Sequence, residues 1–298
     1  MVEKIKVYWY RQDKVAYVFL APSLLILFLF NFIPLLCSVG IAFMDLDIFF
    51  SSPGFAGIAN FAKALQDERV WNALKNTLVF AVTEVPLQIL CGLLVAAAVS
   101  GTTLFSKTAR TVFFIPVVCS MTAVGIVWSL LLDGTIGMVP YFCRQLFGIT
   151  GLNFFRDPNT AMGTVVTMTV WKNFGYTMSI LVVGIQAIST DLFEAARIDG
   201  ASRIQQFFHV TIPGILPSLG FCLITNMIGS IQVFDQVYVT TQGGPQYRTE
   251  TLVQYIYKTG FSNPYDLGYA SAISVLMLTV ILGMSLPVYF GMFRKEEG

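Results

Sequence analysis

Two ionisable side chains fall deep inside long apolar stretches of this 298-residue chain. Glu84 lies about ten residues into one stretch, and Lys172 lies a similar distance into another. Because charge is costly in an apolar medium, such side chains either serve a function or are matched by a partner. Two interpretations stay open. In the first, Glu84 and Lys172 are structural and either form an ion pair or make separate hydrogen bonds to neighbouring helices. In the second, Lys172 lines a cavity for a polar solute together with Trp171, Asn173 and Tyr176.

Neutral polar residues accompany them on two of the apolar stretches. Asn226 and Ser230 are four residues apart and share a helix face, where Gly229 leaves room for a ligand near the backbone. Asn173 and Tyr176 add an amide and an aromatic ring. Hydroxyl-rich ligands need such partners, so a sugar path is one interpretation. The alternative is that these small and polar residues pack helices together.

The composition is that of an integral membrane protein. Hydrophobic residues make up 55% of the chain and charged residues 12%, which is more apolar surface than one soluble core buries. Backbone groups cannot stay unpaired in lipid, so apolar stretches of about 20 residues are expected to be helices. The sequence predicts an all-α, six-helix transmembrane bundle with spans at 16–43, 74–99, 111–132, 161–188, 213–234 and 268–292.

The connections between these spans differ in their content of Lys and Arg, which predicts the orientation in the membrane. Basic residues are denser in one alternate set of segments, namely 1–15, 100–110, 189–212 and 293–298. The other set is longer and poorer in basic residues, namely 44–73, 133–160 and 235–267. We therefore expect a cytoplasmic N-terminal tail (1–15), one transmembrane domain (16–292) and a cytoplasmic C-terminal tail (293–298), with lipid around the spans.

Several function classes lack support in the sequence. There is no glycine-rich phosphate loop and no HExxH or GxSxG motif, so we expect neither catalytic residues nor a bound cofactor. The five cysteines do not have metal-ligand spacing, and a net charge of +1 gives no sign of nucleic-acid binding. His209, the single histidine, is expected to be a contact residue, not a base or a metal ligand.

The polar segment 189–213 is longer than a simple connection between two helices requires. Asp191 with Glu194 has capping-box spacing and predicts a short helix over about 192–198. Gly200 is expected to end that helix in the left-handed conformation. Ser202 with Gln205 repeats the capping box and predicts a second short helix.

That second helix is expected to end near Val210, before Pro213 opens the next span. Both helices have apolar edges, formed by Leu192, Phe193 and Ala196 in the first and by Ile204, Phe207 and Phe208 in the second. The hairpin therefore either contacts a partner protein or lies on lipid headgroups. Its near balance of acidic and basic residues favours the protein partner.

This hairpin resembles the EAA loop of binding-protein-dependent ABC importer permeases. The matching residues are Glu194-Ala195-Ala196, Asp199-Gly200-Ala201, Phe207, Ile212 and Pro213. Further segments are similar to the carbohydrate-uptake subgroup, specifically its maltose-type first permease subunit. They are Gln232-Val233-Phe234-Asp235, Thr241-Gln242-Gly243-Gly244-Pro245 and Asp266-Leu267-Gly268-Tyr269-Ala270-Ser271-Ala272, with Asn76-Thr77, Val85-Pro86-Leu87-Gln88 and Phe114-Ile115-Pro116 upstream.

The resemblance implies a permease subunit of a prokaryotic inner or plasma membrane importer, with no chemistry of its own. It would pair with a second permease subunit as a heterodimer, above an ABC ATPase dimer that binds ATP and Mg. An extracytoplasmic solute-binding protein would dock on the short outer loops, such as 44–73 and the Gly243-Gly244-Pro245 turn, and deliver a sugar. The ATPase-coupling residues implied are Glu194, Ala195, Ala196, Asp199, Gly200, Ala201, Phe207 and Pro213.

The resemblance also implies positions on the substrate pathway. They are Lys172, Asn173 and Tyr176 on the fourth span, and Asn226, Gly229, Ser230 and Val233 on the fifth. The permease of the family that binds maltose has asparagine where this chain has Ser230 and Val233, so maltose is not specifically indicated. The positive charge of Lys172 is also compatible with an anionic sugar as the substrate.

Two other functions would require features that differ from those of an importer subunit. An intramembrane enzyme would use Glu84 or Asp235 as an acid or base and would need a second group beside it. A self-sufficient secondary transporter should show two similar halves or paired interrupted helices. The sequence contains neither a recognised catalytic pair nor a convincing internal repeat.

Overall fold

The computed structural model describes residues 16–51 and 53–293 of the chain. These residues are mostly helical, with one two-stranded sheet. The predicted N-terminal tail, 1–15, lies outside the described residues. So does the predicted C-terminal tail, except for Phe293, which ends the last helix.

Long apolar helices provide three to six candidate membrane spans within the described part of the chain. Three helices are long and apolar enough by themselves, at Ala16–Ile41, Glu68–Val99 and Leu267–Gly291. Three more spans are present if each bent helix pair crosses as one unit. The six-span count therefore stays a prediction.

The predicted third span, 111–132, is not one straight helix. α5 (Leu104–Val118) and α6 (Met121–Leu131) meet at 93°. Cys119 and Ser120 between them have extended backbone conformations. Pro116 has no N–H to donate and crowds the preceding turn, which weakens the end of α5 at this point. Apolarity alone did not reveal this break.

The described residues form two compact units. Unit 1 comprises residues up to Gln66 together with Ile256–Leu276, and unit 2 comprises Asp67–Tyr255 together with the residues from Met277 onward.

The elements of the chain are, in order, η1 (Phe28–Phe32), α2 (Ile33–Ile41), β1 (Met44–Asp45), β2 (Gly54–Phe55), α3 (Ala59–Gln66), α4 (Glu68–Val99), α5, α6, α7 (Met138–Phe147), α8 (Ala161–Gln186), α9 (Thr190–Ile198), α10 (Arg203–Gln206), η2 (Phe207–Thr211), α11 (Ile212–Gly214), α12 (Leu216–Ile231), α13 (Asp235–Thr240), α14 (Leu252–Phe261) and α15 (Leu267–Phe293).

Unit 1 contains regular structure where the sequence predicted a simple outer loop at 44–73. β1 and β2 pair in antiparallel register, with Met44 opposite Phe55. The Asn60 side-chain amide donates to the Met44 carbonyl at 2.8 Å, and Lys63 forms an ion pair with Asp266 at 2.9 Å. These polar contacts fix the short strands and α3 against the chain that leads into α15.

The centre of unit 2 is the close contact between α4 and α8. Gly92 is buried on α4, and a Cβ at that position would lie only 2.8 Å from the Cγ2 of Thr177 on α8. Between helices in lipid, small residues permit such close approach and gain van der Waals contact. Two apolar clusters flank this contact, one around Phe80 and Met168 and the other around Met178 and Leu181.

The hairpin between α8 and α12 is present, and it differs from the prediction at its first end. α9 begins after Ser189, whose hydroxyl accepts the Asp191 N–H at 3.3 Å, so Asp191 is not the N-cap. Asp191 lies instead in the first turn, where its negative charge interacts favourably with the positive end of the helix dipole. Gly200 has φ +79, as predicted, and Ser202 forms the complete capping box with Gln205.

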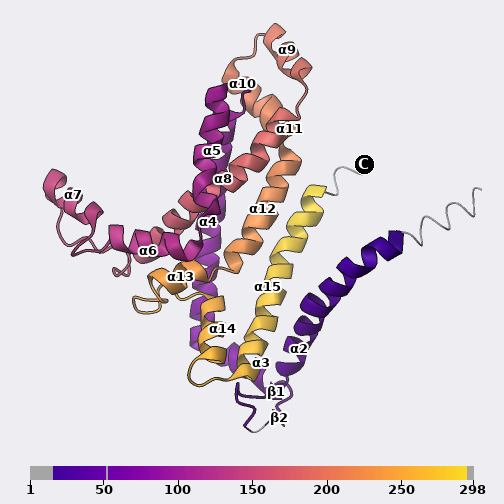
Figure 1. Ribbon diagram of the computed structural model, residues 1–298, viewed down its shortest axis with the longest axis vertical. Coiled ribbons are helices and arrows are strands. Elements are labelled where there is room, and N and C mark those ends of the chain that lie inside the picture. The colour runs from indigo at the N-terminus through magenta and orange to yellow at the C-terminus, as the bar shows by residue number, and fades with distance from the viewer. Residues whose placement is uncertain (1–15, 52, 294–298) are drawn as a thin grey trace, which may run out of the picture. The chain divides into compact units, whose positions relative to one another are not determined.

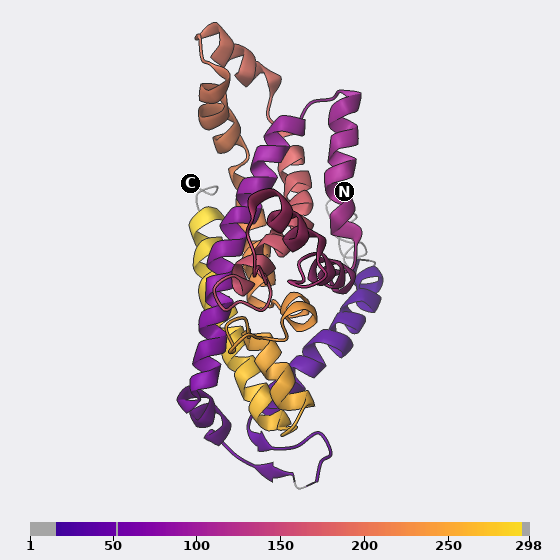
Figure 2. The same cartoon turned by 90° about the vertical axis from the view of Figure 1, so that its left-hand side faces the viewer.

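The second helix is longer than predicted. It continues past Val210 as the π-turn η2, in which the Ile212 N–H donates to the Phe207 carbonyl, and it ends with α11 at Gly214. The sharp bend of 67° into α12 lies at Ile215, two residues after Pro213. In both views α9 and α10 lie beyond the ends of α5 and α8 within unit 2 (Figure 1, Figure 2).

The α4–α8 contact gives a first prediction. Gly92→Leu should force the two helices apart and destabilise the protein by about 1–3 kcal/mol, as overpacking does. Thermal unfolding of the purified protein in detergent should show a lower midpoint. Gly163→Leu on α8 is the matched control, because nothing lies within 4 Å of a Cβ at Gly163. Equal midpoints for the two variants would contradict the close contact.

Candidate functional site

A polar cavity of about 210 Å³ lies within unit 2. Five elements supply its wall, namely α4, α5, α8, α12 and α13. The lining residues are Phe80, Glu84, Gln88, Val117, Thr169, Asn173, Tyr176, Thr225, Asn226, Gly229, Ser230 and Gln236. An amide-rich and hydroxyl-rich wall with aromatic rings is chemically suited to a polyhydroxylated ligand.

The structure brings together five of the seven residues expected on the pathway. They are Asn173, Tyr176, Asn226, Gly229 and Ser230. Helical spacing accounts for this, because residues three or four apart share a face. Glu84, one of the two intramembrane ionisable residues, lies on the same wall.

Lys172 and Val233 do not line this cavity. The Lys172 ammonium donates to the Val117 carbonyl at 3.2 Å and to Asn173 Oδ1 at 3.3 Å. Val233 is 1% exposed and belongs to an apolar cluster. Among the described residues there is no ion pair between Lys172 and Glu84. Lys172 makes separate hydrogen bonds instead, which is the other structural alternative that the sequence left open.

One buried hydroxyl orients the amides of the wall. Thr177 Oγ1 accepts hydrogen bonds from Gln88 Nε2 and from Asn226 Nδ2, each at 3.2 Å. These bonds join α4, α8 and α12 at the cavity. Gln88, Thr169 and some other lining residues were not among those expected on the pathway from the sequence. The signal was available, since Gln88 lies one helical turn after Glu84 and Thr169 one turn before Asn173.

The hairpin presents the second feature of functional interest. Glu194 and Asp199 are exposed, and the neighbouring apolar side chains Ile198 and Ile204 are 86% and 71% exposed. At the base of the hairpin, a hollow of about 310 Å³ is lined by Ala97, Ser100, Ile185, Phe193, Arg203, Gln206, Phe207 and Thr211. An exposed apolar edge beside charged residues is typical of a surface that contacts a partner.

The residues expected to couple to an ATPase are distributed over this hairpin. Glu194, Ala195 and Ala196 lie on α9, and Asp199, Gly200 and Ala201 form the turn. Phe207 begins η2 and Pro213 lies in α11. All eight residues therefore belong to one hairpin.

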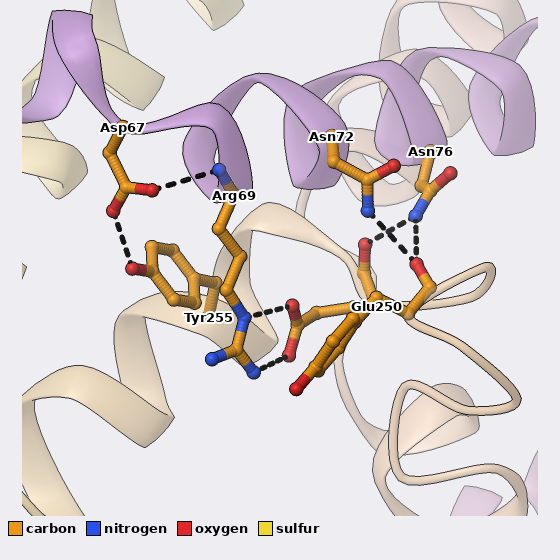
Figure 3. Close-up of polar contacts among 7 residues, drawn as sticks. Asp67, Arg69, Asn72, Asn76, Glu250 and Tyr255 are labelled. Carbon is orange, nitrogen blue, oxygen red and sulfur yellow. Dashed lines mark hydrogen bonds and ion pairs between the residues drawn. The ribbon is translucent and has the colours of Figure 1, made fainter.

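A third polar cluster, missed by the sequence analysis, ties the start of α4 to the segment after α13 (Figure 3). Arg69 Nε and a second guanidinium nitrogen each donate to one oxygen of Glu250 at 2.8 Å. The Arg69 guanidinium also lies over the rings of Tyr247 and Tyr255, at 4.3 and 5.0 Å. Glu250 is fully buried. These contacts hold segment 241–251 against α4.

Backbone groups strengthen this attachment. Asn76 Nδ2 donates to the carbonyls of Tyr247 and Glu250, and Thr77 Oγ1 accepts the Leu252 N–H. Gly243, in the predicted Gly243-Gly244-Pro245 turn, has φ +87. The turn is therefore a fixed element, because its backbone partners are supplied from α4 and from within the segment.

Within the described part of the chain, no group of three or more His, Cys, Asp or Glu side chains is arranged to hold a metal ion. The polar residues of the cavity are amides and hydroxyls with a single carboxylate. Such a wall can bind and orient a solute through hydrogen bonds.

Comparison with known proteins gives a consistent result. The family described as "Binding-protein-dependent transport system inner membrane component" matches residues 69–295. The probable ABC transporter permease protein YurN of Bacillus subtilis (strain 168) is 34% identical over 295 residues, covering 96% of this chain and 99% of its own. The lactose transport system permease protein LacF of Rhizobium radiobacter is 30% identical, with 95% and 96% covered.

A further relative and a solved structure extend the comparison. The sn-glycerol-3-phosphate transport system permease protein UgpA of Agrobacterium fabrum (strain C58) is 31% identical, covering 90% of this chain and 91% of its own. The fold is shared with a bacterial alginate ABC transporter solved in complex with an alginate pentasaccharide-bound periplasmic protein, with TM-score 0.83, 21% identity, and 95% and 96% coverage.

The Arg69–Glu250 pair gives a second prediction. Arg69→Leu removes the guanidinium from a buried carboxylate and should cost about 2 kcal/mol, less than for a fully buried pair because the Arg69 side chain is 38% exposed. Adding Glu250→Gln should recover part of that loss. Thermal unfolding and protease cleavage within 241–251 would measure both effects. Lys75→Met, at an exposed position on the same helix, is the control and should leave both unchanged.

Proposed function

Because this chain belongs to the binding-protein-dependent transport system inner membrane component family, we propose that it is a permease subunit of an ATP-driven importer for a carbohydrate. It forms half of the translocation path and pairs with a second permease subunit. The chain crosses the membrane six times, with both termini in the cytoplasm. ATP is hydrolysed by a separate ABC ATPase dimer, so this subunit is not an enzyme.

The polar cavity is the observation that carries this proposal. Five residues that were expected on the substrate pathway (Asn173, Tyr176, Asn226, Gly229 and Ser230) line one cavity, together with Glu84, between helices that are otherwise apolar. The names of relatives support a sugar or a related polar solute, since LacF is named for lactose and UgpA for sn-glycerol 3-phosphate. The cavity would hold the solute during its passage.

The hairpin is the proposed contact with the ATPase. Its exposed Glu194 and apolar edge would sit in a groove of the ATPase, as the resemblance to the EAA loop implies. α9 follows α8 after a short break with a bend of 70°, and α12 follows α11 after a bend of 67°. Closure of the ATPase dimer would therefore move the two helices that supply Asn173, Tyr176 and Asn226 to the cavity.

An extracytoplasmic solute-binding protein is the proposed source of the sugar. The solved alginate transporter is in complex with a periplasmic protein, which supports a partner of this kind. The turn at Gly243-Gly244-Pro245, held by the Arg69–Glu250 cluster, is a fixed surface suited to docking. Other outer segments, including β1, β2 and α3, are available for the same contact.

The two rival functions predict different behaviour of the purified protein. A secondary transporter or an intramembrane enzyme works alone. The proposed subunit should be inactive until the second permease, the ATPase and the binding protein are added. Activity of the isolated chain would refute the proposal.

The coupling role of the hairpin gives a third prediction. Glu194→Lys or Gly200→Asp should reduce uptake at least about tenfold and weaken ATPase assembly, while membrane insertion stays intact. Uptake of the sugar bound by the accompanying solute-binding protein, with co-purification of the ATPase, measures both. Gly148→Asp is the matched control: Gly148 has φ +68 and, like Gly200, no atom within 4 Å of an added Cβ. Normal uptake by the Gly200 variant would refute the role.

The cavity gives a fourth prediction. Asn226→Ala and Tyr176→Ala should each lower uptake about tenfold, which corresponds to about 1.4 kcal/mol for a lost hydrogen bond or ring contact. Assembly with the ATPase should not change. Val183→Ala on α8, which is exposed and does not line the cavity, should transport normally. Unchanged uptake in both cavity variants would remove the proposed path.

A further inference from the structure

The segment between α6 and α8 contains an amphipathic helix, α7, whose apolar side points away from the protein. Met138, Phe142 and Leu146 share that side, because residues four apart lie on one helix face. Their side chains are 58%, 51% and 71% exposed. Tyr141 and Arg144 lie on the other side, where they line a pocket of about 80 Å³ together with the loops that flank α7. The polar side of α7 therefore faces its own loops, and the apolar side is uncovered.

Both ends of α7 are held by hydrogen bonds, so the helix is not a loose extension. The backbone N–H groups of Thr135 and Ile136 donate to the Asp133 carboxylate at 2.8 and 3.2 Å and fix the turn before the helix. At the other end, the N–H of Gly148, in the left-handed conformation, donates to the Arg144 carbonyl at 3.1 Å. A helix with satisfied ends can lie where little water reaches its backbone.

The packing of α6 places α7 near one edge of the membrane. Val124 of α6 and Leu132, which follows it, belong to one apolar cluster with Val166 of α8. Val166 precedes Gln186, the end of α8 next to the hairpin, by 20 residues. That separation is about 30 Å along a helix, which is the thickness of the hydrocarbon core. Since the polar hairpin lies outside the hydrocarbon at one edge, α6 packs at the opposite edge.

α7 lies to the side of unit 2 at the level of α6. α6 turns away from α5 by 93°, and α7 continues the chain away from the other helices of the unit (Figure 1). In the view at right angles, the same segment lies in front of the bundle, on the side that faces the viewer (Figure 2). With 10 residues, α7 is about 15 Å long, which is too short to cross a bilayer.

The charge of α7 is suited to a phosphate group. Arg144 is the only charged residue in the helix. In the part of the chain that the structure describes, its guanidinium has no hydrogen bond or ion pair and lies 5.8 Å from the centre of the Tyr141 ring. The lining of the pocket beside it includes the hydroxyl-bearing Thr150 and no Asp or Glu. Guanidinium groups bind phosphate oxygens through paired hydrogen bonds.

We propose that α7 is an interfacial helix, with its apolar side among the acyl chains of one leaflet and Arg144 on the phosphate of a phospholipid headgroup. Short amphipathic helices with aromatic and basic residues bind membrane surfaces in this way. The contact anchors the α6–α7 segment and so fixes the level of the bend after α5. It goes beyond the transport function, and only its assignment to the outer leaflet rests on the proposed cytoplasmic position of the hairpin.

Spin labels on the full-length chain in phospholipid nanodiscs test the position of α7. The five native cysteines are first replaced by Ala or Ser. A single label is then attached at Leu146→Cys or at Gln145→Cys, both at exposed positions. These positions are about 100° apart around the helix, with Leu146 within the apolar side and Gln145 at its edge. Collisions of each label with oxygen, which concentrates in lipid, and with a water-soluble nickel chelate are measured.

The ratio of oxygen to nickel collisions should be severalfold higher at Leu146→Cys than at Gln145→Cys. Equal ratios with ready access of nickel to both labels would overturn the proposal, because α7 would then lie in water. Adding the second permease subunit and the ATPase should leave the collisions of the Leu146→Cys label with oxygen unchanged. Their loss in the assembled importer would also overturn it, because a protein and not lipid would then cover the apolar side.

The phosphate contact is tested with a bimane fluorophore on Gln145→Cys, one residue from Arg144. Phosphatidylglycerol titrated into the detergent-solubilised full-length chain should change the bimane emission. Arg144→Gln should raise the half-saturating lipid concentration at least about fivefold, because a cation near a lipid phosphate is lost. Arg156→Gln is the matched control, since Arg156 is an exposed arginine of the same segment, and it should leave the titration unchanged.

Inorganic phosphate distinguishes a headgroup from a free anion. At millimolar concentration it should neither change the bimane emission nor displace the lipid. A response to inorganic phosphate alone, no response to the lipid, or equal titrations with and without Arg144 would each overturn the headgroup contact. None of these measurements uses a sugar or ATP. A failure here is therefore distinguishable from a failure of the importer assignment, which the Gly200→Asp uptake assay tests.

Discussion

The packing of α4 on α8 at Gly92 and Thr177 is the constraint on which the rest of unit 2 depends. Because Gly92 has no side chain, the helices approach until Thr177 is fully buried. In that position its single hydroxyl oxygen reaches Gln88 and Asn226 and holds three helices at one point. A wider separation of α4 and α8 would release both amides and remove the shape of the cavity wall.

The same requirement, that buried polar groups find partners, explains the outer cluster and the bends. Glu250 is fully buried and is matched by a guanidinium that enters from α4, so the segment after α13 is fixed without regular secondary structure. At Cys119 and Ser120 the chain turns where proline has already weakened the helix. Membrane-embedded chains can bend at such points only where neighbouring helices cover the exposed backbone.

α8 and α12 each connect the cavity to one end of the hairpin, through a bend of 70° after α8 and of 67° before α12. α8 supplies Asn173 and Tyr176 and ends next to α9, while α12 supplies Asn226 and Ser230 and follows the π-turn and α11. π-turns and helix bends are frequent at functional sites, where they allow limited adjustment of helix direction. A movement of the hairpin would therefore be transmitted to the amides of the cavity wall through α8 and α12. This arrangement is what the proposed mechanism requires of the subunit.

The sequence by itself determined the features that depend on local chemistry and helical period: the apolar stretches, the capping box at Ser202, the left-handed Gly200, and the shared faces of Asn226 with Ser230 and Asn173 with Tyr176. Only the tertiary structure decided which way Lys172 points, that Ser189 caps α9, and that Arg69 meets Glu250, 181 residues away. The physical reason is that hydrogen-bond partners distant in sequence, and competing caps two residues apart, are chosen by packing and not by residue type.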